Sequence, residues 1–484
     1  MAVSDLPRYD LVVIGCGPGG YKSAIIAAHM GAKVAIIEKF LPGGTCLNQG
    51  CVPKEAILRL ARILGDVNRL EGRGLVGRVQ GDFVAALHHQ RELVENIRAT
   101  LLPWLRQLGI KFYAGSAKVV AADTVLITPN DPSTTPQEII AKKIIIATGA
   151  APRRDPVCIP DGQRIIDTRD FMFNLDRKPN NVLWVGGGAI GCELGYAMRQ
   201  FGVNVTVVEQ GDRLLNRGGI AERASQTLER KFAQMGIKVI KNACVAQLDK
   251  SSDDNIKVQF SDGQQGEYDT ILVAVGRVPH IEGLGLAEIG VECDEEGFIV
   301  TNEYLETTVP NIYAVGDVKR GPMTANSAFH DAKIATLNAL NGNRELYNYN
   351  RVPIVIDTAL PIATVGLSED RAELAGFEPD VARANLAGST IARIHHGGEG
   401  YIEVVHDAET GQLLGGNIVG PQAGEMINML TAACQSQRGL WFFTDMSYSH
   451  PSWNEELENA IARSVAAFNR SEEEVFRPGI YAID

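Results

Sequence analysis

Two cysteines lie five positions apart in the glycine-rich segment PGGTCLNQGCVPK, residues 42–54. In a regular helix Cys46 and Cys51 would be separated by about 7.5 Å along the axis, whereas the Cα atoms of a disulfide lie about 4.4–6.8 Å apart. We therefore expect a distorted backbone, followed by a helix through residues 56–63 that would stabilise a thiolate at its N-terminal end. The glycines that permit the distortion are Gly43, Gly44 and Gly50. The pattern predicts a redox-active cysteine pair.

Two alternatives are open for this pair, namely two unrelated buried thiols or two ligands of a zinc site. A zinc site needs further ligands, and the sequence has no second closely spaced cysteine pair and no Cys/His cluster. We therefore expect no metal. The scattered cysteines are Cys16, Cys158, Cys192, Cys244, Cys293 and Cys434. Such scattering is typical of a protein in a reducing compartment and not of a disulfide framework.

A histidine and a glutamate near the end of the chain could provide acid–base chemistry. His450 and Glu455 lie in SHPSWNE, residues 449–455, just before a helical stretch over residues 456–468. Pro451 suits the first position of a helix, which would leave His450 outside it and let its ring turn back toward Glu455. A carboxylate on one imidazole nitrogen makes the other more basic, as deprotonation of a thiol requires. A capping or surface histidine is the simpler alternative.

Two glycine-rich turns are predicted to bind dinucleotides. In each copy an apolar strand enters the turn, a helix follows, and a second strand ends in an acid 23 residues after the first glycine. Backbone amides at the start of such a helix must approach a pyrophosphate closely, and the acid can bind a ribose. The first copy has Gly15, Gly17, Gly20 and Glu38, and the second has Gly186, Gly188, Gly191 and Glu209.

The acid of the second copy bears on the choice of nicotinamide cofactor. Glu209 would repel a 2′-phosphate and so favours NAD over NADP, although Arg213 and Arg217 follow closely and could receive that phosphate.

Three further apolar runs end in small or acidic residues. Residues 144–149 end in Thr148 and Gly149, residues 271–276 end in Gly276, and residues 311–317 end in Asp317. The first two are also explained as buried strands, whereas the Asp317 carboxylate could meet a sugar-like hydroxyl.

Taken together, the double dinucleotide unit, the GGTCxxxxC segment, the AVGD run and the late HPxxxE resemble the pyridine nucleotide-disulfide oxidoreductase family, and within it the lipoamide dehydrogenases. The resemblance covers nearly the whole chain. It implies that FAD binds the first unit, that NAD binds the second, and that a C-terminal domain forms a homodimer. It also implies that Cys46 exchanges with substrate, that Cys51 faces the flavin, and that His450 and Glu455 act from the partner subunit.

The resemblance assigns cofactor contacts residue by residue. For FAD they are Gly15, Gly17, Gly20, Glu38, Gly44, Thr45, Lys54, Thr148, Gly149 and Asp317, and for NAD they are Gly186, Gly188, Gly191, Glu209 and Gly276. Lys54 is expected to lie close to the flavin and to pair with Glu193.

The sequence departs from the family pattern at a few positions. Glu55 follows Lys54 and would add a negative charge near the flavin. The segment from Thr358 to Pro361 replaces a Thr-His-Pro-Glu run, and Asn326 and Tyr448 stand where histidines are common. These positions bear on the substrate more than on the reaction type.

Composition narrows the class of protein. Hydrophobic residues make up 45% of the 484 positions, charged residues make up 21%, and the formal net charge is −12. This balance is that of a globular protein and opposes binding to nucleic acid or to an anionic membrane surface. The N-terminus has no apolar signal core, and no apolar run reaches the length of a membrane span, so we expect a cytoplasmic protein.

The expected fold is α/β, with two Rossmann-like dinucleotide-binding domains and a C-terminal α+β dimerisation domain. The predicted boundaries are 1–152 for the FAD domain, 153–275 for the NAD domain, 276–350 for a central segment that completes the FAD site, and 351–484 for the interface domain.

The predicted function is electron transfer between a protein-bound dihydrolipoyl dithiol and NAD. One alternative is a reductase of glutathione or another small disulfide, and another is a redox-inactive FAD-binding scaffold. Mercuric reductase fits less well, because it would need a C-terminal thiol pair and Cys434 is the only cysteine in the last third of the chain.

Overall fold

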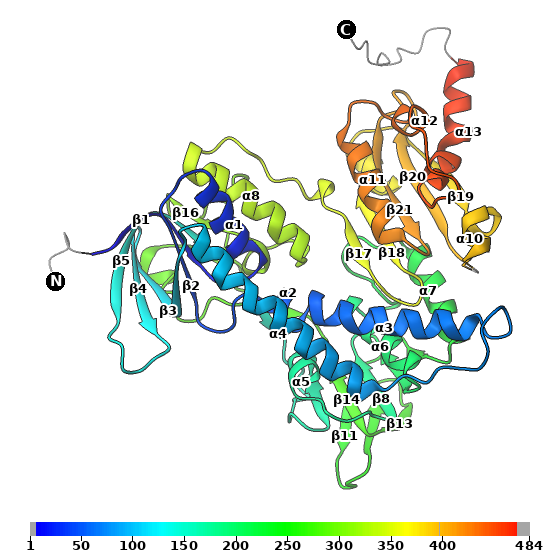
Figure 1. Cartoon of the computed structure of the whole chain (residues 1–484), viewed down its shortest axis with the longest axis horizontal. Coiled ribbons are helices and arrows are strands. Elements are labelled where there is room, and N and C mark those ends of the chain that lie inside the picture. Colours follow the sequence, from blue (N-terminus) through cyan, green and yellow to red (C-terminus); the bar gives the residue numbers. More distant parts are fainter. Residues whose placement is uncertain (1–5, 396, 472–484) are drawn as a thin grey trace. The chain divides into compact units, whose positions relative to one another are not determined.

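The computed structural model describes residues 6–395 and 397–471 (Figure 1). The chain divides into two compact units. The described residues of the first unit are 6–186, 197–208 and 244–347, and those of the second are 187–196, 209–243 and 348–471.

The first unit contains a parallel sheet in which most strands are apolar and largely buried, as parallel strands usually are. The strands are β1 (Arg8–Ile14), β2 (Val34–Glu38), β3 (Lys111–Ala121), β5 (Gln137–Ile146) and β16 (Ile312–Ala314). Their pairing gives the order β3-β2-β1-β5-β16. Beyond the parallel region, β3 and β5 each pair antiparallel with β4 (Thr124–Pro129), which lies between them. The carboxyl ends of β1, β2, β5 and β16 therefore lie along one edge of the parallel sheet.

Helices cover this sheet and carry the cysteine segment. The helices α1 (Pro18–His29) and α8 (Ala325–Asn341) pack side by side, and their apolar residues join β1 in one core (Figure 1). The short helix α2 (Gly44–Gln49) is followed at once by α3 (Cys51–Arg69), which packs on α4 (Phe83–Gln107).

A second parallel sheet of the first unit has the strand order β9-β8-β14-β7. Its strands are β7 (Ile165–Asp167), β8 (Asn181–Val185), β9 (Asn204–Val208) and β14 (Thr270–Val273). The remaining elements of this region are α5 (Thr168–Phe173), the pair β6 (Ala150–Pro152) and β15 (Arg277–Pro279), and a hairpin sheet of β11 (Val245–Asp249), β12 (Ile256–Phe260) and β13 (Gln265–Tyr268).

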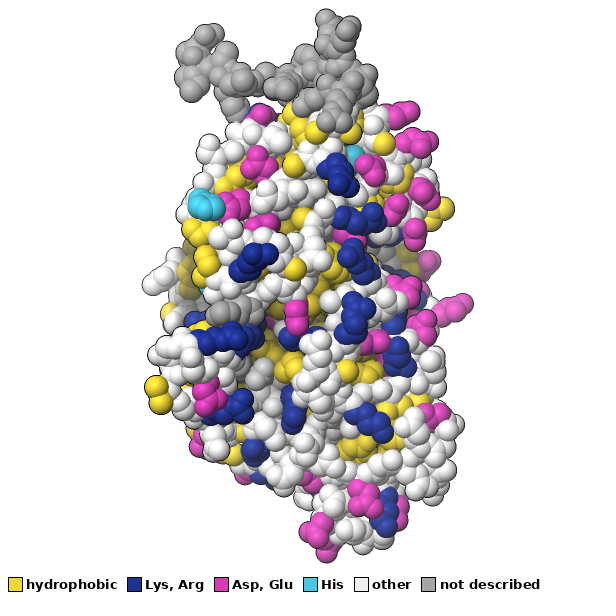
Figure 2. All heavy atoms as spheres, turned by 90° about the vertical axis from the view of Figure 1, so that its right-hand side faces the viewer, with side chains coloured by type: hydrophobic (Ala, Val, Ile, Leu, Met, Phe, Trp, Pro, Cys, Tyr) yellow, Lys and Arg dark blue, Asp and Glu magenta, His cyan; other side chains and the backbone are white. Residues whose placement is uncertain are grey.

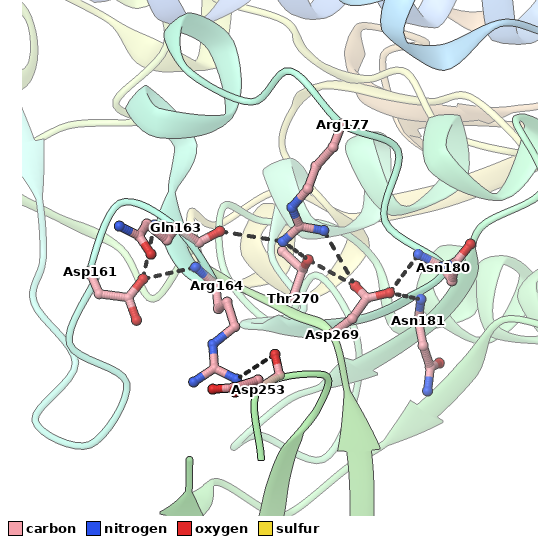
Figure 3. A network of polar contacts seen from close by, with 9 residues as sticks. All are labelled: Asp161, Gln163, Arg164, Arg177, Asn180, Asn181, Asp253, Asp269 and Thr270. Carbon is pink, nitrogen blue, oxygen red and sulfur yellow. Dashed lines mark hydrogen bonds and ion pairs between the residues drawn. The ribbon is translucent and has the colours of Figure 1, made fainter. Parts of the chain in front are cut away.

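A polar network fixes the amino ends of β8 and β14 (Figure 3). One oxygen of Asp269 accepts hydrogen bonds from the backbone N–H groups of Asn180 and Asn181, at 2.7 and 3.0 Å. Its other oxygen accepts from Thr270 Oγ1 at 2.9 Å, and Arg177 donates to the same hydroxyl at 2.8 Å. The network thus holds β8 and β14 at their amino ends. Gly186 and Gly276 follow the opposite, carboxyl ends of these strands.

The second unit contains an antiparallel sheet of order β17-β18-β21-β20-β19. Its helices α11 (Ala423–Gln435) and α13 (Glu455–Ser471) contact the sheet and share its apolar core. The strands are β17 (Ile354–Ile356), β18 (Ile362–Gly366), β19 (Pro379–Asn385), β20 (Tyr401–Asp407) and β21 (Leu413–Val419). The shorter helices are α9 (Glu369–Leu374), α10 (Thr390–Ile394) and α12 (Trp441–Thr444).

Two elements of the nucleotide region also belong to the second unit, namely α7 (Glu222–Gln234) and β10 (Lys238–Ile240). The helix α6 (Ala189–Gln200) follows the second glycine turn. The predicted fold class, α/β with two Rossmann-like regions and a C-terminal α+β domain, is confirmed. Among the described residues, no helix is long and apolar enough to cross a membrane.

Candidate active site

The first glycine turn joins β1 to α1. Gly15 has φ +102°, and a Cβ there would lie 2.4 Å from the carbonyl oxygen of Ala147. A Cβ at Gly20 would lie 1.8 Å from the oxygen of Gly15, so this position excludes every other residue type. The turn is therefore fixed by sterics, and glycine turns of this kind let a phosphate group approach the backbone amides at the start of a helix.

Glu38, the acid of the first copy, stabilises this turn through hydrogen bonds. Glu38 ends β2, and its carboxylate accepts hydrogen bonds from the backbone N–H groups of Cys16 at 2.8 Å and Phe40 at 2.7 Å. The position at the carboxyl end of β2 is where such an acid meets a ribose in dinucleotide-binding folds. The predicted pairing of turn and acid is thus present in the geometry, and ribose binding stays a prediction.

The cysteine segment folds directly onto the first turn. Gly44, with φ +59°, packs so closely on Gly17 that a Cβ would lie 2.6 Å from the Gly17 Cα atom. The backbone N–H of Gly43 donates to the oxygen of Cys16 at 2.8 Å. At Gly50 the helix is interrupted, with φ −131° and ψ −112°, so that Cys46 lies in α2 and Cys51 begins α3. The distortion predicted from the cysteine spacing is confirmed.

The two cysteines are in the thiol form, and they interact. A hydrogen bond with Cys51, followed by burial, raises the pKa of the Cys46 thiol. Cys51 is exposed and lies at the N-terminal end of a 19-residue helix, where the helix dipole favours a negative charge. The arrangement places a half-buried thiol with a raised pKa beside an exposed thiol that the helix can stabilise as thiolate.

The charge of Glu55 is balanced within its own helix. Its carboxylate forms an ion pair with Arg62, two turns further along α3, and the Glu55 side chain is 49% exposed. This geometry weakens the expected effect of Glu55 on a flavin. Lys54 lies in the first turn of the same helix. Glu193 is buried in the second unit and accepts a hydrogen bond from the backbone N–H of Asp357 at 2.9 Å. The pairing of Lys54 with Glu193 stays a prediction.

The ends of β5, β14 and β16 bring the other predicted FAD contacts, and the predicted NAD contact Gly276, to one region of the first unit. Thr148 donates from Oγ1 to the carbonyl oxygen of His280 at 2.7 Å. Gly149 and Gly276 have φ +69° and +113°. Asp317 lies in the short 3-10 helix that follows β16, and burial raises the pKa of its carboxyl group.

Arg277, which no sequence pattern singled out, contacts several of these parts. Its guanidinium lies 3.8 Å from the Asp317 carboxylate, donates to Thr45 Oγ1 at 3.4 Å and donates to the carbonyl oxygen of Ala150. Burial lowers the pKa of this group, while Asp317 and then Asp167 and Cys51 raise it. The only signal in the sequence was a charged residue placed directly after the glycine of an otherwise apolar run.

The second glycine turn has the same steric restriction and the same acid contacts as the first. Gly186 has φ +110°, and a Cβ there would lie 2.4 Å from the oxygen of Ala274. Glu209 accepts hydrogen bonds from the backbone N–H groups of Gly187 and Gly211, each at 2.7 Å. Gly188 is exposed, and Gly191 is buried within α6. The predicted acid is thus in place at the second turn.

Arg213 is occupied by structural hydrogen bonds. It donates to the carbonyl oxygens of Leu215 at 3.3 Å and Ile220 at 3.2 Å, and to Ser225 Oγ at 2.8 Å. An arginine held in this way cannot turn to a 2′-phosphate without losing these bonds. The geometry therefore favours NAD, as Glu209 also does.

The histidine–glutamate pair forms as predicted, but its local structure differs from the expectation. His450 Nδ1 lies 3.1 Å from Glu455 Oε2, and Glu455 Oε1 accepts from the backbone N–H of Ser452 at 3.1 Å. These contacts lower the pKa of Glu455, the Ser452 N–H most and His450 next. The imidazole is 73% exposed.

Pro451 does not begin the helix. The helix α13 begins at Glu455, and the His450–Pro451 bond is cis. The expectation for Pro451 was therefore wrong. Glu455 itself begins the helix, and its side chain accepts a hydrogen bond from the backbone N–H of Ser452.

Comparisons with known proteins decide the family. The model of the pyridine nucleotide-disulphide oxidoreductases matches residues 9–332, and the model of the dimerisation domain of the same proteins matches residues 352–461. This chain belongs to the pyridine nucleotide-disulphide oxidoreductase family.

Relatives and solved structures agree with this membership of the oxidoreductase family. A dihydrolipoyl dehydrogenase of Chlorobaculum tepidum is 35% identical over 94% of this chain and 96% of its own length. A dihydrolipoyl dehydrogenase of Thermus scotoductus is also 35% identical, over 94% and 97%. Among structures, LpdA of Mycobacterium tuberculosis has a TM-score of 0.86 at 25% identity, over 95% and 99%. The flavoprotein disulfide reductase RclA of Escherichia coli has a TM-score of 0.81 at 26% identity, over 94% and 99%.

The positions that depart from the oxidoreductase pattern are built into the fold. Tyr448 donates to the carbonyl oxygen of Phe443 at 2.9 Å, so its hydroxyl secures the loop before His450. Thr358 is buried and donates to the oxygen of Cys192 at 3.2 Å. Asn326 lies in the first turn of α8. The effect of these three positions on substrate choice stays a prediction.

Proposed function

We propose that this chain is a dihydrolipoamide dehydrogenase-like flavoenzyme, which transfers an electron pair between a dihydrolipoyl dithiol and NAD. The observation that carries the proposal is the Cys46–Cys51 pair, folded by Gly43 and Gly44 directly onto the first dinucleotide turn. Relatives named dihydrolipoyl dehydrogenase, which match nearly the full length of the chain, support the same activity.

Both cofactors of this family fit the residues present. At Gly15 and Gly186 a side chain would collide with backbone, and the acids Glu38 and Glu209 stand where riboses are bound. FAD held by the first turn and NAD held by the second would supply the hydride chemistry. Arg277 would oppose the effect of burial, which raises the pKa of the Asp317 carboxyl group beside the first site.

The residues of this chain would carry out the exchange of thiol and disulfide. One dihydrolipoyl thiolate attacks Cys46 in the oxidised pair, the Cys46–Cys51 bond breaks, and Cys51 leaves as a thiolate. The second dihydrolipoyl thiol then attacks the mixed disulfide, which releases the cyclic disulfide and the Cys46 thiol. The two electrons now reside in the cysteine pair, and a base must take the substrate protons. His450, held by Glu455, is that base in this proposal.

We further propose that the enzyme is a homodimer in which His450 acts on the cysteines of the partner. The matched dimerisation domain and the 73% exposure of the imidazole support this arrangement. A lipoyl group on a separate carrier protein is the proposed substrate, since a swinging group can reach a site between subunits. The proposal includes a cytoplasmic location, which the free, scattered cysteines support.

Steady-state assays test the activity. Dihydrolipoamide with NAD should give a kcat/KM far above that of glutathione disulfide with NADPH. A higher value for the second pair would establish the small-disulfide reductase instead. An FAD-loaded protein without turnover of either pair would favour the scaffold alternative.

A mixed dimer tests the shared site. His450→Ala should slow dithiol oxidation by about 10² to 10⁴, the usual effect of a positioned acid–base group, without loss of FAD. Neither Cys46→Ser nor His450→Ala homodimers should turn over dihydrolipoamide at an appreciable rate. One subunit of each should restore one intact site. If the assembled mixed dimer is as inactive as both parents, the site is not shared.

A further inference from the structure

A groove in the second unit lies between α7 and the segment that leads into β20. Its volume is about 330 Å³, within the range of sites for small molecules. The helix lines one side with Arg223, Arg230 and Lys231, and the other side includes Asn385, Glu399 and Tyr401. None of these residues belongs to the dinucleotide turns, the cysteine pair or the His450–Glu455 pair.

The spacing along α7 gathers its basic side chains on one face. Positions 223, 227, 230, 231 and 234 recur at three- and four-residue steps, so they follow one side of the helix. Arg230 donates to Thr227 Oγ1 at 2.9 Å and forms no ion pair with any residue in 6–395 or 397–471. A guanidinium of this kind keeps most of its donors for a ligand. The side of the molecule shown in Figure 2 carries Lys and Arg side chains interleaved with Asp and Glu.

Two carboxylates hold the other two basic groups in place. Lys231 Nζ lies 2.5 Å from Glu399 at the groove. Arg223 lies 2.5 Å from Glu403 and stacks over the ring of Tyr401, with 3.9 Å from its guanidinium carbon to the ring centroid. These contacts fix the wall of the groove before any ligand arrives, and they reduce its net positive charge. A long polyanion is therefore a poor match, and a single anionic group is a better one.

The second observation is the hydroxyl of Tyr401. The residue is only 4% exposed, yet its oxygen has no hydrogen-bond partner within the part of the chain that the structure describes. Arg223 and Arg230 are both close enough to act electrostatically on this group. Tyr401 lines the groove, and a buried polar atom usually has a partner, so its unpaired hydroxyl indicates a ligand that accepts its proton.

We propose that this groove binds the phosphate group of a small hydroxylated phosphate ester. The oxygens of a phosphate would accept hydrogen bonds from Arg230, Lys231 and Tyr401, which lie on both walls. Glu399 and Asn385 would accept hydrogen bonds from the hydroxyls of the ester. A ligand bound in this way would tie α7 to β20, two elements that the sequence separates widely. The inference does not depend on the proposed redox activity.

Binding to the FAD-loaded protein tests the site. NAD is kept saturating, so that phosphate cannot enter the second dinucleotide turn, and potassium chloride holds the ionic strength constant. The probes are inorganic phosphate and ribose 5-phosphate, and the measurement is the shift of the thermal midpoint with concentration. Saturable stabilisation is expected for both probes. Tighter binding of the ester than of phosphate would support the ester, and equal binding would support a site for free phosphate.

Variants assign the binding to the groove. Arg230→Gln and the nearly isosteric Tyr401→Phe should each raise the Kd for inorganic phosphate by about tenfold, since each removes a donor to the anion. Lys257→Gln, which removes one exposed positive charge from β12 in the first unit, should leave the Kd unchanged. The proposal is overturned if the wild-type protein shows no saturation up to about 50 mM phosphate. It is also overturned if both groove variants bind as the wild type does.

Discussion

The two dinucleotide turns use the same backbone device. In each, the first glycine has a positive φ, +102° at Gly15 and +110° at Gly186. In each, a Cβ on that glycine would lie 2.4 Å from a carbonyl oxygen of a neighbouring strand end, which leaves no space for a side chain. In each, the acid accepts two backbone hydrogen bonds that hold the turn.

The two turns differ in what covers them. At the first, Gly44 lies against Gly17, with a built Cβ 2.6 Å from its Cα atom. At the second, no described atom lies within 4 Å of a Cβ built on Gly188. The cysteine segment therefore closes over the first turn, and the second is left open at the corresponding position. This difference suits a cofactor that stays bound at the first turn and one that exchanges at the second.

The largest expected effect tests this difference with one substitution at each turn. Gly44→Ala should reduce the FAD content of the purified protein by about tenfold or more, because alanine is strained at φ +59° and its Cβ would collide with Gly17. Gly188→Ala should retain the wild-type FAD content. The flavin-to-protein absorbance ratio measures both. Equal FAD contents in the two variants would show that the first turn is not closed in the way the geometry indicates.

A second substitution tests whether the acid of the second turn, Glu209, sets the preference for NAD over NADP. Glu209→Gln removes the charge that repels a 2′-phosphate and weakens the hydrogen bonds that the carboxylate accepts from Gly187 and Gly211. We expect kcat/KM for NAD to fall by about tenfold to a hundredfold, as for the loss of a charged hydrogen bond. The preference for NAD over NADP should fall with it. Steady-state kinetics with both cofactors are the measurement, and an unchanged preference would rule out repulsion by Glu209 as its source.

The sequence was sufficient for these turns because their residues are close in sequence and their requirements are steric. The glycines and the acid at a fixed spacing follow from the backbone approach that a pyrophosphate requires. The break between Cys46 and Cys51 was predictable for the same reason, since a regular helix cannot bring the two thiols together.

Contacts between distant segments could not be predicted in this way. Arg277 reaches Thr45, Ala150 and Asp317, and no local pattern connects these positions. Similarly, Pro451 was expected at the start of α13, but the helix begins at Glu455, whose carboxylate accepts a hydrogen bond from the Ser452 N–H. Side-chain hydrogen bonds of this kind depend on tertiary geometry, which a residue pattern does not contain.

Arg213 provides a test of stability without a change of specificity. Its guanidinium bonds to Leu215, Ile220 and Ser225 shape the loop after Glu209. Arg213→Gln should lower the free energy of unfolding by about 1–3 kcal/mol, since buried carbonyl groups lose their partner. The ratio of kcat/KM for NAD to that for NADP should stay as in the wild type. Thermal denaturation and the same kinetic assay are the measurements. A shift of specificity away from NADP would show instead that Arg213 receives the 2′-phosphate.

The smallest expected effect concerns Asn216, a side chain that supports the acid of the second turn and has no counterpart at the first turn among residues 6–395 and 397–471. Asn216 donates from Nδ2 to Glu209 Oε1 at 3.2 Å, whereas the hydrogen bonds that Glu38 accepts come from backbone N–H groups. Because Asn216 is exposed, Asn216→Ala should weaken the orientation of the Glu209 carboxylate by about 0.5–1 kcal/mol, which corresponds to a twofold to fivefold rise in KM for NAD. The FAD content and kcat should not change, since two backbone hydrogen bonds still hold the carboxylate. Steady-state kinetics at varied NAD concentration measure the effect, and Asn255→Ala, on an exposed loop of the first unit, is a control for removal of an amide. If KM for NAD is unchanged in Asn216→Ala, the backbone alone orients both acids, and the two turns differ only in the segment that covers the first.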